Sequence, residues 1–459
     1  MDYFCEKCYL KTDDKEKFDT HFENTPELCG CKKVNNNYTI VETFVGCGGS
    51  HLGFKNNGFK TIFVNDIWRV SLDTLSNNNK ELTDEQIICK DINELCKEDL
   101  LTKYNIEKKS LSLLIGGVVC KGFSLAGVRN PYDKRNYLYI SQLKLVEQFM
   151  PKISIIENVP GMDNMKILYK NGYAPVSKKM QPENLSDKVI QLCLNIDDII
   201  INYKSNRGKI IAINKKLNVS ETNTLENRKI KEILEIEKLK IDKSRSEYEN
   251  KLEKYKYSVV DDIIERYNEL GYKIYKKKLK VSNYGGYTNR IRLIIVAVRN
   301  DIKKEWKWPK ITNDDNDDDL PNLHTVKDAF NNLQLLDDEK NNIKNDLDNI
   351  PMNHKKATIE KFKKITHDKK STGFSSRGTS HRLNYNKPAP TLVPGHSSFQ
   401  IHPEYHRSIT VREGATITGF PIDYKFSGSH TDRCMQIGNA IPVNLADALA
   451  KSVIEILDE

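Results

Sequence analysis

Cys120 is the side chain of this sequence best suited to act as a nucleophile. It lies on the glycine-flanked segment Gly116 to Ser124, directly after the short apolar run Leu111 to Ile115, which predicts a buried strand. Open α/β folds place their chemistry in the turns that leave the carboxyl ends of strands. A thiolate in such a turn is a soft nucleophile that can add to an electron-poor ring carbon. A buried thiol that only packs is the alternative for a single cysteine.

The glycine-rich turn Glu42 to Gly49 is a candidate cofactor site. It follows a predicted strand and precedes a predicted helix, Ser50 to Asn57, so a ligand can approach both the glycine backbone and a helix N-terminus. The next strand ends about twenty residues on, near Asp66, where a carboxylate can bind ribose hydroxyls. Asp91 follows a third strand and suits an adenine amino group. The spacing G-x-G-x-x-G is absent, which favours a nucleoside cofactor without a pyrophosphate; a structural tight turn is the alternative.

The N-terminal segment, residues 1–37, carries the spacing of a small zinc finger. Two cysteines separated by two residues are followed, after twelve residues, by a histidine and then by two further cysteines, a pattern typical of structural zinc sites. The interval after the histidine is longer than usual, and a flexible thiol-bearing tail is the alternative. The candidate ligands are Cys5, Cys8, His21 and Cys29, with Cys31 as the other choice for the fourth.

The composition indicates an intracellular chain with a polyanionic partner. Of its 459 residues, 38% are hydrophobic and 29% are charged, and no apolar run is long enough to span a bilayer. The first residues lack a secretory signal. We therefore expect a location in the cytoplasm or nucleus, no membrane partner, and 10 cysteines that are reduced, metal-bound or catalytic. The net charge of +9 favours nucleic acid as the partner.

From Tyr38 onward, strand-like runs alternate with helical ones, which predicts a doubly wound α/β sheet. The helical patterns include Tyr137 to Phe149 and Val259 to Leu270. The strand candidates are Tyr38 to Val45, Phe59 to Val64, Leu111 to Ile115, Ile153 to Glu157, Tyr272 to Val281 and Ile291 to Val298.

Two segments interrupt this alternation. Residues from about 175 to 256 are rich in Lys, Glu, Ile and Leu and predict an inserted helical hairpin. This hairpin is either a solvated excursion or a basic arm for nucleic acid or a partner protein. Residues 301–377 are polar and predict a loop-rich recognition region. The heptad-like apolar positions of the hairpin are Leu234, Ile241, Tyr248, Leu252 and Tyr255.

These segments, taken in order, resemble the motifs of the DNA cytosine-5 methyltransferase family. The resemblance covers about residues 38–174, 257–300 and 378–459, and the ordered set is far more specific than any one motif. The matching segments are Phe44 to Gly49, Cys120, Asp133 to Leu138, Glu157 to Val159, Arg290 with Arg292, Pro390 to Leu392, Thr410 to Glu413, Gly419 to Pro421 and Gln436 to Pro442.

The resemblance implies an S-adenosylmethionine-dependent, Rossmann-like methyltransferase domain at 38–300 that carries the helical insertion. It also implies a smaller, loop-rich target-recognition domain at 301–430 and a C-terminal segment, 431–459, that returns to the catalytic domain. The cofactor contacts that it implies are Phe44, Gly46, Gly48, Gly49, Asp66, Ile67, Asp91, Ile92, Leu138, Asn439 and Ala440.

The resemblance also assigns catalytic roles. The thiolate of Cys120 adds to cytosine C6, which makes C5 a carbon nucleophile toward the methyl sulfonium. Glu157 holds a proton against N3. Arg290 and Arg292 lie two apart on a strand and so share one face; one binds the cytosine carbonyl and the other supports Glu157 or the nucleophile loop. A phosphate-binding pair is the alternative. The base must be flipped out of double-stranded DNA, and we expect a monomer.

The sequence departs from the family pattern beside the reacting groups. Val118 and Val119 stand where two prolines are usual, Lys121 replaces a glutamine, and Tyr287-Thr288 replaces Pro-Gln. We therefore keep two alternatives to an active DNA enzyme of restriction–modification or viral type. One is a catalytically impaired nucleic-acid-binding homologue, and the other is a transfer-RNA cytosine-5 methyltransferase.

Overall fold

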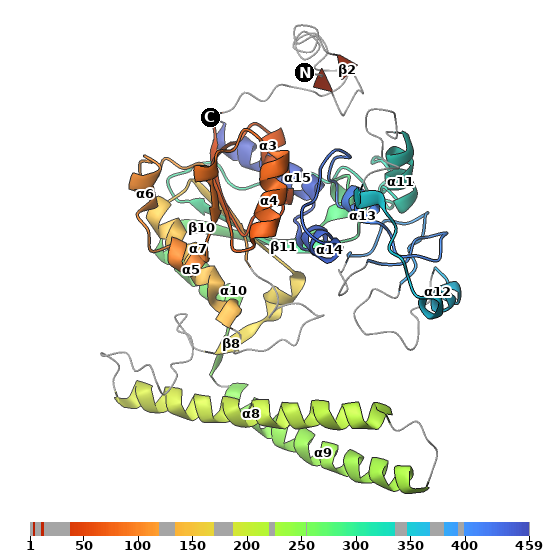
Figure 1. Cartoon of the computed structure of the whole chain (residues 1–459). Helices are drawn as coiled ribbons and strands as arrows, with labels where there is room; N and C mark the ends of the chain where they lie inside the picture. The colour runs from red at the N-terminus through yellow and green to blue at the C-terminus, as the bar shows by residue number, and fades with distance from the viewer. Residues whose placement is uncertain are drawn as a thin grey trace. The chain divides into compact units, whose positions relative to one another are not determined.

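The computed structural model describes residues 3–4, 11–12, 37–118, 134–168, 187–219, 225–253, 255–335, 347–367, 381–392 and 399–458 (Figure 1). The chain divides into two compact units. The first contains Met1–Gly117, Leu145–Glu157 and Tyr275–Glu459, and the second contains Val118–Lys144 and Asn158–Ile274. Within the described ranges no helix combines the length and apolarity needed to cross a membrane.

A seven-stranded sheet, carried mostly by the first unit, dominates the described residues. Its order is β10-β11-β7-β6-β3-β4-β5, and the strands from β7 to β5 run parallel to their neighbours. The bounds are β3 Thr39–Thr43, β4 Lys60–Asp66, β5 Ile87–Cys89, β6 Leu113–Gly117, β7 Ile153–Asn158, β10 Tyr272–Lys280 and β11 Ile291–Arg299. This arrangement confirms the predicted α/β fold.

The strand order defines where a ligand binds such a sheet. From β3 the chain moves outward through β4 and β5, then returns to β6 on the other side of β3 and continues to β7. Open α/β sheets bind ligands at this reversal, beyond the carboxyl ends of the two central strands. The glycine-rich turn follows β3, and the segment that carries Cys120 follows β6.

The C-terminal helix packs on the first helix of the sheet. In the first unit, α15 (Val443–Leu457) lies against α3 (Gly49–Asn56) (Figure 1). A Cβ on Gly53 would come within 2.5 Å of the Ala446 Cβ, so the two helices approach at a distance that only glycine allows. The other α-helices described in this unit are α4 Arg69–Asn78, α5 Ile92–Leu95, α6 Leu100–Lys103, α11 Val326–Leu335, α12 Lys356–Lys363, α13 Val411–Ile417 and α14 His430–Asn439, while α7 Leu138–Phe149 contributes to both units.

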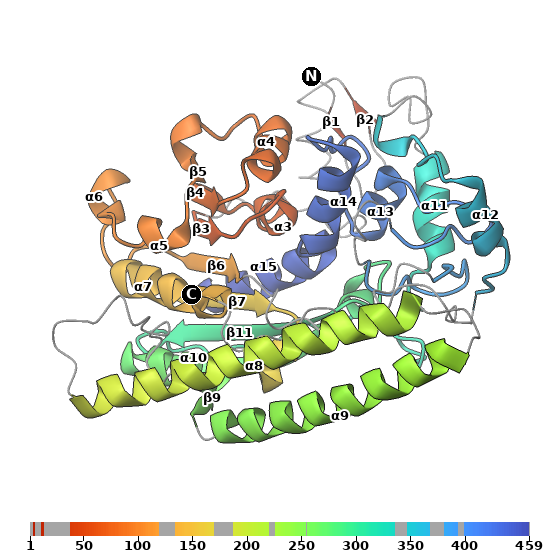
Figure 2. The same ribbon diagram turned by 60° about the horizontal axis from the view of Figure 1, so that its bottom comes forward.

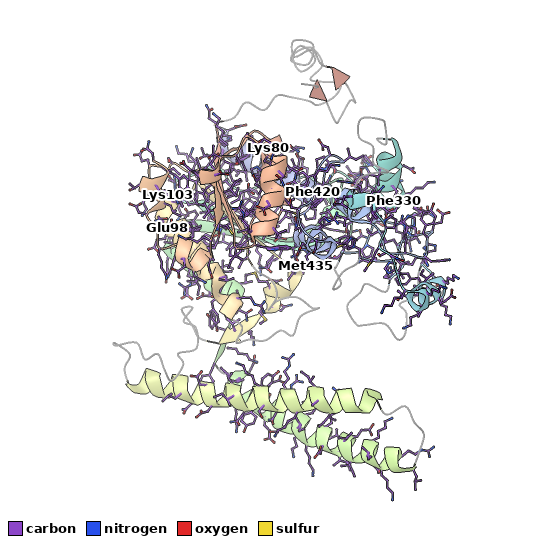
Figure 3. The ribbon with its side chains drawn as sticks, in the orientation of Figure 1. Lys80, Glu98, Lys103, Phe330, Phe420 and Met435 are labelled. Atoms are coloured by element: carbon purple, nitrogen blue, oxygen red, sulfur yellow. The ribbon has the colours of Figure 1, made fainter. Side chains whose placement is uncertain are left out.

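A second apolar core holds the loop-rich part of the first unit. Phe330 and Phe420, labelled in Figure 3, belong to it together with Phe399. Cys47 of the glycine-rich turn and Ala440 after α14 are buried in the same core. The predicted small domain therefore shares its packing with the candidate cofactor turn.

The second unit contains the predicted helical hairpin. Helices α8 (Asp187–Val219) and α9 (Leu225–Glu253) run side by side (Figure 2). The two helices run antiparallel. Asn206 Nδ2 donates a hydrogen bond to Ser244 Oγ at 3.0 Å, whereas Ile200, earlier in α8, packs with Leu252, later in α9. At the base, β8 (Lys166–Leu168) pairs antiparallel with β9 (Lys256–Ser258), followed by α10 (Val259–Glu269). The helical insertion is confirmed.

The heptad-like pattern of α9 is enclosed only near this base. Leu252 is buried, and Tyr248 and Tyr255 pack against it. Leu234 and Ile241 are half-buried, whereas Ile233, Ile236 and Leu239 are exposed. In the distal half of α9, apolar side chains therefore stay exposed, because α8 covers only part of them.

Candidate active site

The turn between β3 and α3 has a left-handed backbone at three positions. Phe44, Gly46 and Gly48 have φ values of 53°, 58° and 92°, and glycine adopts such angles without cost. Because Phe44 leaves the extended conformation, β3 ends at Thr43 rather than at the predicted Val45. A Cβ built on Gly46 meets no atom within 4 Å, so a ligand has room to approach the backbone there.

A buried carboxylate ties the two ends of this turn together. Glu42, on β3 and 0% exposed, accepts a hydrogen bond from Ser50 Oγ at 2.8 Å and pairs with His51 Nδ1 at 2.7 Å. Both partners lie in the first turn of α3, so Glu42 fixes α3 on β3. The sequence analysis missed this role; its signal was a carboxylate inside an apolar strand, where an unpaired charge is costly.

Asp66 ends β4 and contacts the same turn. Its Oδ2 accepts from Gly46 N–H at 2.9 Å and its Oδ1 from Trp68 N–H at 2.8 Å. Burial raises the pKa of Asp66, although these backbone donors oppose the shift. The adjacent Ile67 is 67% exposed, which leaves an apolar surface beside the carboxylate. Each oxygen keeps a further lone pair for a ligand hydroxyl.

Asp91 lies two residues after β5 and caps a short helix. Its Oδ1 accepts from Asn93 N–H at 2.8 Å at the start of α5. Asn65, at the end of β4, donates to the Lys90 carbonyl at 2.8 Å and thereby fixes this strand end beside β4. Ile92 is buried. The predicted adenine site thus combines a carboxylate that already caps a helix with an isoleucine that belongs to the core.

Residues after α14 lie close to the glycine-rich turn within the first unit. A Cβ on Gly49 would meet the Ile441 carbonyl oxygen at 2.2 Å and the Ala440 Cβ at 3.2 Å. Asn439, the last residue of α14, is exposed. Three of the predicted cofactor residues, Gly49, Asn439 and Ala440, therefore lie in one part of the first unit.

Glu157 and Arg292 form a buried ion pair at the edge where β6 ends. Arg292 Nε contacts Glu157 Oε1 at 2.6 Å. Glu157 is paired in register with Gly117, and a Cβ built on Gly117 would lie 3.4 Å from Glu157 Oε2. The second carboxylate oxygen therefore faces the start of the segment that leads to Cys120. The geometry joins two of the four predicted catalytic side chains.

Arg290 has a different set of partners. Its Nη1 donates to the Gly438 carbonyl at 2.8 Å, which anchors the end of α14. Thr288 accepts a hydrogen bond from Arg290 N–H at 3.2 Å and donates to the Ala389 carbonyl at 2.9 Å. The threonine that departs from the family pattern thus links the arginine segment to the strand-like residues near Ala389.

In the second unit, Asn158 holds the beginning of the nucleophile segment. Its Nδ2 donates to the Val118 carbonyl at 2.9 Å, and Val118 precedes Cys120 by two residues. Leu138, a predicted cofactor contact, begins α7 and is half-buried. Cys120 and the predicted zinc ligands Cys5, Cys8, His21 and Cys29, with Cys31, lie outside the described residues.

The fold and the groups at the carboxyl edge of the sheet are those of a methyltransferase-type α/β protein, and the comparisons with known proteins give the family. The family model for C-5 cytosine-specific DNA methylase matches residues 38–256 and 249–455. The chain therefore belongs to that family and is a DNA cytosine-5 methyltransferase.

Individual relatives agree with this family over nearly the whole chain. The type II methyltransferase M.Eco47II of Escherichia coli is 26% identical over 93% of this chain and 81% of its own length. M.DdeI of Desulfomicrobium norvegicum is 27% identical over 90% and 88%. A solved prophage-encoded chain from E. coli, described as a DNA modification methyltransferase, has a TM-score of 0.56 at 20% identity and covers 92% of this chain and 100% of its own. This structural likeness supports the fold.

Proposed function

We propose that this chain transfers a methyl group from S-adenosylmethionine to C5 of a cytosine flipped out of double-stranded DNA, through a transient bond between Cys120 Sγ and C6. The observation that supports this most is the Glu157–Arg292 pair, whose second carboxylate oxygen faces Gly117, three residues before Cys120 in the sequence. This contact supports a role for Glu157 as an acid beside the segment that supplies the nucleophile.

The residues around the glycine-rich turn fit a nucleoside cofactor. The open space over Gly46 gives a ligand access to the backbone. The carboxylate of Asp66 can accept hydrogen bonds from hydroxyl groups, and the exposed Ile67 offers an apolar face. No side chain caps the N-terminus of α3 in the described structure, so its N–H groups can face a carboxylate. S-adenosylmethionine supplies an electrophilic methyl group when bound.

The contacts support the following catalytic roles. Cys120 adds to C6, and Glu157 Oε2 donates a proton to N3, which relieves the negative charge that the addition creates. Arg292 holds Oε1, which leaves Oε2 for the base. Its Nη1 donates to the Ile291 carbonyl at 2.9 Å, and its Nη2 suits the cytosine carbonyl. Arg290, bonded to the Gly438 carbonyl, positions the C-terminal segment. Once C5 carries the methyl group, water takes the C5 proton, the bond between C6 and Cys120 Sγ breaks to release the thiolate, and Glu157 recovers the proton from N3.

The partner and the domain roles are part of the same proposal. Double-stranded DNA fits the net charge of +9, because basic side chains neutralise phosphates. Residues 301–430 then read the target and residues 431–459 complete the catalytic domain. The names of the type II relatives favour a role in restriction–modification.

The test is methyl transfer from labelled S-adenosylmethionine to a DNA duplex, with transfer RNA in a parallel reaction. We expect label in DNA with the wild type and none with Cys120→Ala. A duplex that contains 5-fluorocytosine should trap the wild type covalently, because the fluorine that replaces the C5 proton cannot leave as a cation and the bond from C6 to sulfur therefore persists. Equal incorporation by Cys120→Ala would remove Cys120 from the mechanism, and label in RNA alone would overturn the substrate.

A further inference from the structure

Tyr424 reaches into the glycine-rich turn from the segment that follows α13. Its hydroxyl donates a hydrogen bond to the Cys47 carbonyl at 2.6 Å. The two residues are 377 positions apart in the sequence, and both are buried, with Tyr424 only 3% exposed. A buried phenol hydroxyl that bonds a backbone carbonyl holds that carbonyl in one orientation.

The same hydroxyl occupies the space above Gly48. A Cβ built on Gly48 would lie 2.8 Å from Tyr424 Oη and 3.3 Å from a methyl group of Leu75. Gly48 has a φ of 92° and is the N-cap of α3. The tyrosine thus contacts the turn at its carbonyl and at the glycine where the turn becomes a helix. Burial raises the pKa of Tyr424 well above its ordinary value, so the hydroxyl remains a donor.

The backbone of Tyr424 is itself held by a buried charge cluster. Arg412, fully buried in α13, donates from Nη2 to the Tyr424 carbonyl at 2.8 Å. The same Nη2 contacts Asp348 Oδ2 at 3.3 Å, and Asp348 Oδ1 accepts from Arg433 Nη1 at 2.7 Å. Asp348 also accepts from Phe426 N–H at 3.2 Å. One carboxylate therefore links α13, α14 and the segment that carries the tyrosine.

Helix α4 fixes the residues that follow Tyr424. Asn78 Oδ1 accepts from Lys425 N–H at 2.8 Å, and Asn78 Nδ2 donates to the Lys425 carbonyl at 2.8 Å. Thr74 Oγ1 accepts from Ser427 N–H at 2.8 Å. The backbone at and just after Tyr424 is thus held by α13 and by α4.

We propose that Tyr424 is a positioning residue of the methyl-donor site, whose hydroxyl holds the turn Phe44–Gly49 in the conformation that binds S-adenosylmethionine. This rests on the proposed function of the turn. It also makes the small domain part of cofactor binding, because the Asp348–Arg412 contact fixes the carbonyl of Tyr424. The reacting cytosine is not involved, so the effect belongs to cofactor affinity and not to the chemical step.

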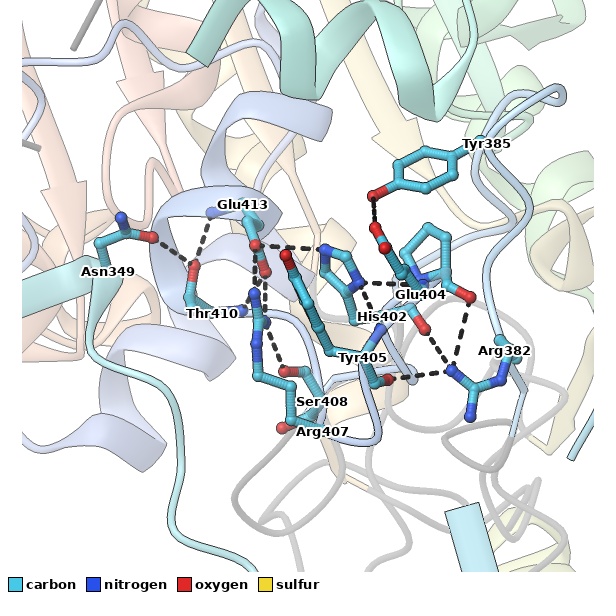
Figure 4. A network of polar contacts seen from close by, with 11 residues as sticks. Asn349, Arg382, Tyr385, His402, Glu404, Tyr405, Arg407, Ser408, Thr410 and Glu413 are labelled. Carbon is cyan, nitrogen blue, oxygen red and sulfur yellow. Dashed lines mark hydrogen bonds and ion pairs between the residues drawn. The ribbon is translucent and has the colours of Figure 1, made fainter. Parts of the chain in front are cut away.

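The experiment compares the wild type with Tyr424→Phe, which removes one oxygen atom and keeps the ring. Calorimetry with S-adenosylmethionine alone should show binding weakened by about tenfold, because the Cys47 carbonyl loses its buried donor. The KM for S-adenosylmethionine should rise to a similar extent, whereas kcat and the KM for DNA stay within twofold. Tyr385→Phe is the matched control, since the Tyr385 hydroxyl contacts the exposed Glu404 at 3.4 Å (Figure 4).

A double-mutant cycle with Gly48→Ala separates positioning from general destabilisation. The Cβ that Gly48→Ala adds collides with Tyr424 Oη when the tyrosine is present and does not meet that atom in Tyr424→Phe. Gly48→Ala should therefore weaken cofactor binding less in the Tyr424→Phe background than in the wild type. Additive losses, or an unchanged affinity in Tyr424→Phe, would overturn the inference. A fall in kcat with unchanged cofactor affinity would overturn it as well. If the wild type bound no S-adenosylmethionine at all, the proposed function itself would fail first.

Discussion

At the scale of single residues, the site depends on carboxylates that are only partly engaged. Glu157 gives one oxygen to Arg292 and turns the other toward Gly117. Asp66 gives each oxygen to one backbone N–H group. A buried carboxylate is tolerated because of these bonds, and each keeps a lone pair or a proton position for chemistry. The same contacts that stabilise the fold therefore orient the reactive atoms.

The two arginines should be distinguishable by kinetics. Arg292→Lys keeps the charge but loses the planar fork that holds Glu157, so we expect kcat to fall about 100-fold with little change in the KM for S-adenosylmethionine. Arg290→Lys disturbs the carbonyl of Gly438 and should instead raise that KM by about fivefold. Steady-state rates with DNA and cofactor varied in turn measure both. Identical kinetic defects would contradict the separate roles.

Glu157→Gln tests the proton at N3. The amide keeps the size of the side chain and cannot donate a proton as an acid, so kcat should fall by roughly 100-fold to 10,000-fold. Binding of S-adenosylmethionine without DNA should stay unchanged, because Glu157 takes no part in the glycine-rich turn. Rapid-quench methyl transfer gives the rate of the chemical step. A variant with a wild-type rate would exclude Glu157 as the acid.

The sequence predicts that Arg290, Arg292 and Glu157 belong to the site, but it does not predict which contacts each arginine makes. The i, i+2 spacing of Arg290 and Arg292 places both on one face, and both are buried. Nothing in the sequence tells which one meets Glu157, because that depends on Gly438, whose carbonyl draws Arg290 away. Tyr424 was missed for the same reason. Its partner Cys47 is distant in sequence, and the aromatic residue alone predicts only a core position.

At the scale of elements, the loop that carries residues 402–407 is fixed by one arginine. Arg382 Nη1 donates to the carbonyls of His402 at 2.7 Å and Tyr405 at 2.9 Å (Figure 4). Its Nη2 donates to the Phe362 carbonyl at 2.7 Å. Arg407 completes the loop with a two-point contact to Glu413 at 2.8 and 2.7 Å. The small domain lacks a large sheet among its described residues, and such polar contacts replace the strand ladder.

His402 makes this loop sensitive to acid. Its Nδ1 accepts from the N–H groups of Glu404 and Tyr405, both at 3.0 Å, which requires a neutral ring. Burial lowers the pKa of His402 to about 4, with nearby Arg407 and Arg382 adding to the shift and Glu413 opposing it. The unfolded chain takes up this proton near its ordinary pKa of about 6.5. Stability from His402 is therefore complete above pH 6.5 and is lost as the pH falls toward 4.

The measurement is the free energy of unfolding in urea between pH 7.5 and pH 4.5. We expect the wild type to lose stability steadily below pH 6.5, and His402→Asn, whose amide oxygen can replace Nδ1, to show a smaller slope. His406→Asn is the control, because His406 is exposed on the same loop. Equal slopes for the wild type and His402→Asn would show that another group senses the acid.

Most elements were predictable because their apolar patterns are strong. The predicted strands and helices agree with β4, β6, β7, β10, β11, α7 and α10 to within a few residues. The ends differ where a local bond decides them: Phe44 turns to a positive φ after Thr43, and Asp91 caps α5. The heptad-like spacing of α9 predicts the helical hairpin, and within α9 the pattern is enclosed at the base near Leu252. The periodicity of a sequence shows which face of a helix is apolar, but it does not show how much of that face a neighbouring helix covers.

At the scale of the whole molecule, the chain builds its central sheet from both ends of the sequence. The first unit combines the N-terminal strands with the segment from Tyr275 to the C-terminus. The close approach of Gly53 to Ala446 and of Gly49 to Ile441 joins them. In the second unit, the antiparallel pairing of β8 with β9 places Leu168 opposite Lys256. The segment between Leu168 and Lys256, which contains the hairpin, therefore begins and ends at neighbouring positions of this strand pair.

This geometry predicts that the hairpin can be removed. A variant in which residues 169–255 are replaced by the two-residue turn Asn-Gly keeps the β8–β9 register, because such turns connect paired antiparallel strands. We expect kcat and the KM for S-adenosylmethionine to stay within about threefold, because α8 and α9 form their own core around Ile200 and Leu252. If the hairpin is only a solvated excursion, its removal leaves the KM for DNA unchanged at all salt concentrations. If it is a basic arm that binds DNA, its removal raises the KM for DNA and reduces the dependence of DNA affinity on salt. Loss of cooperative unfolding in the variant would contradict the independence of the hairpin core.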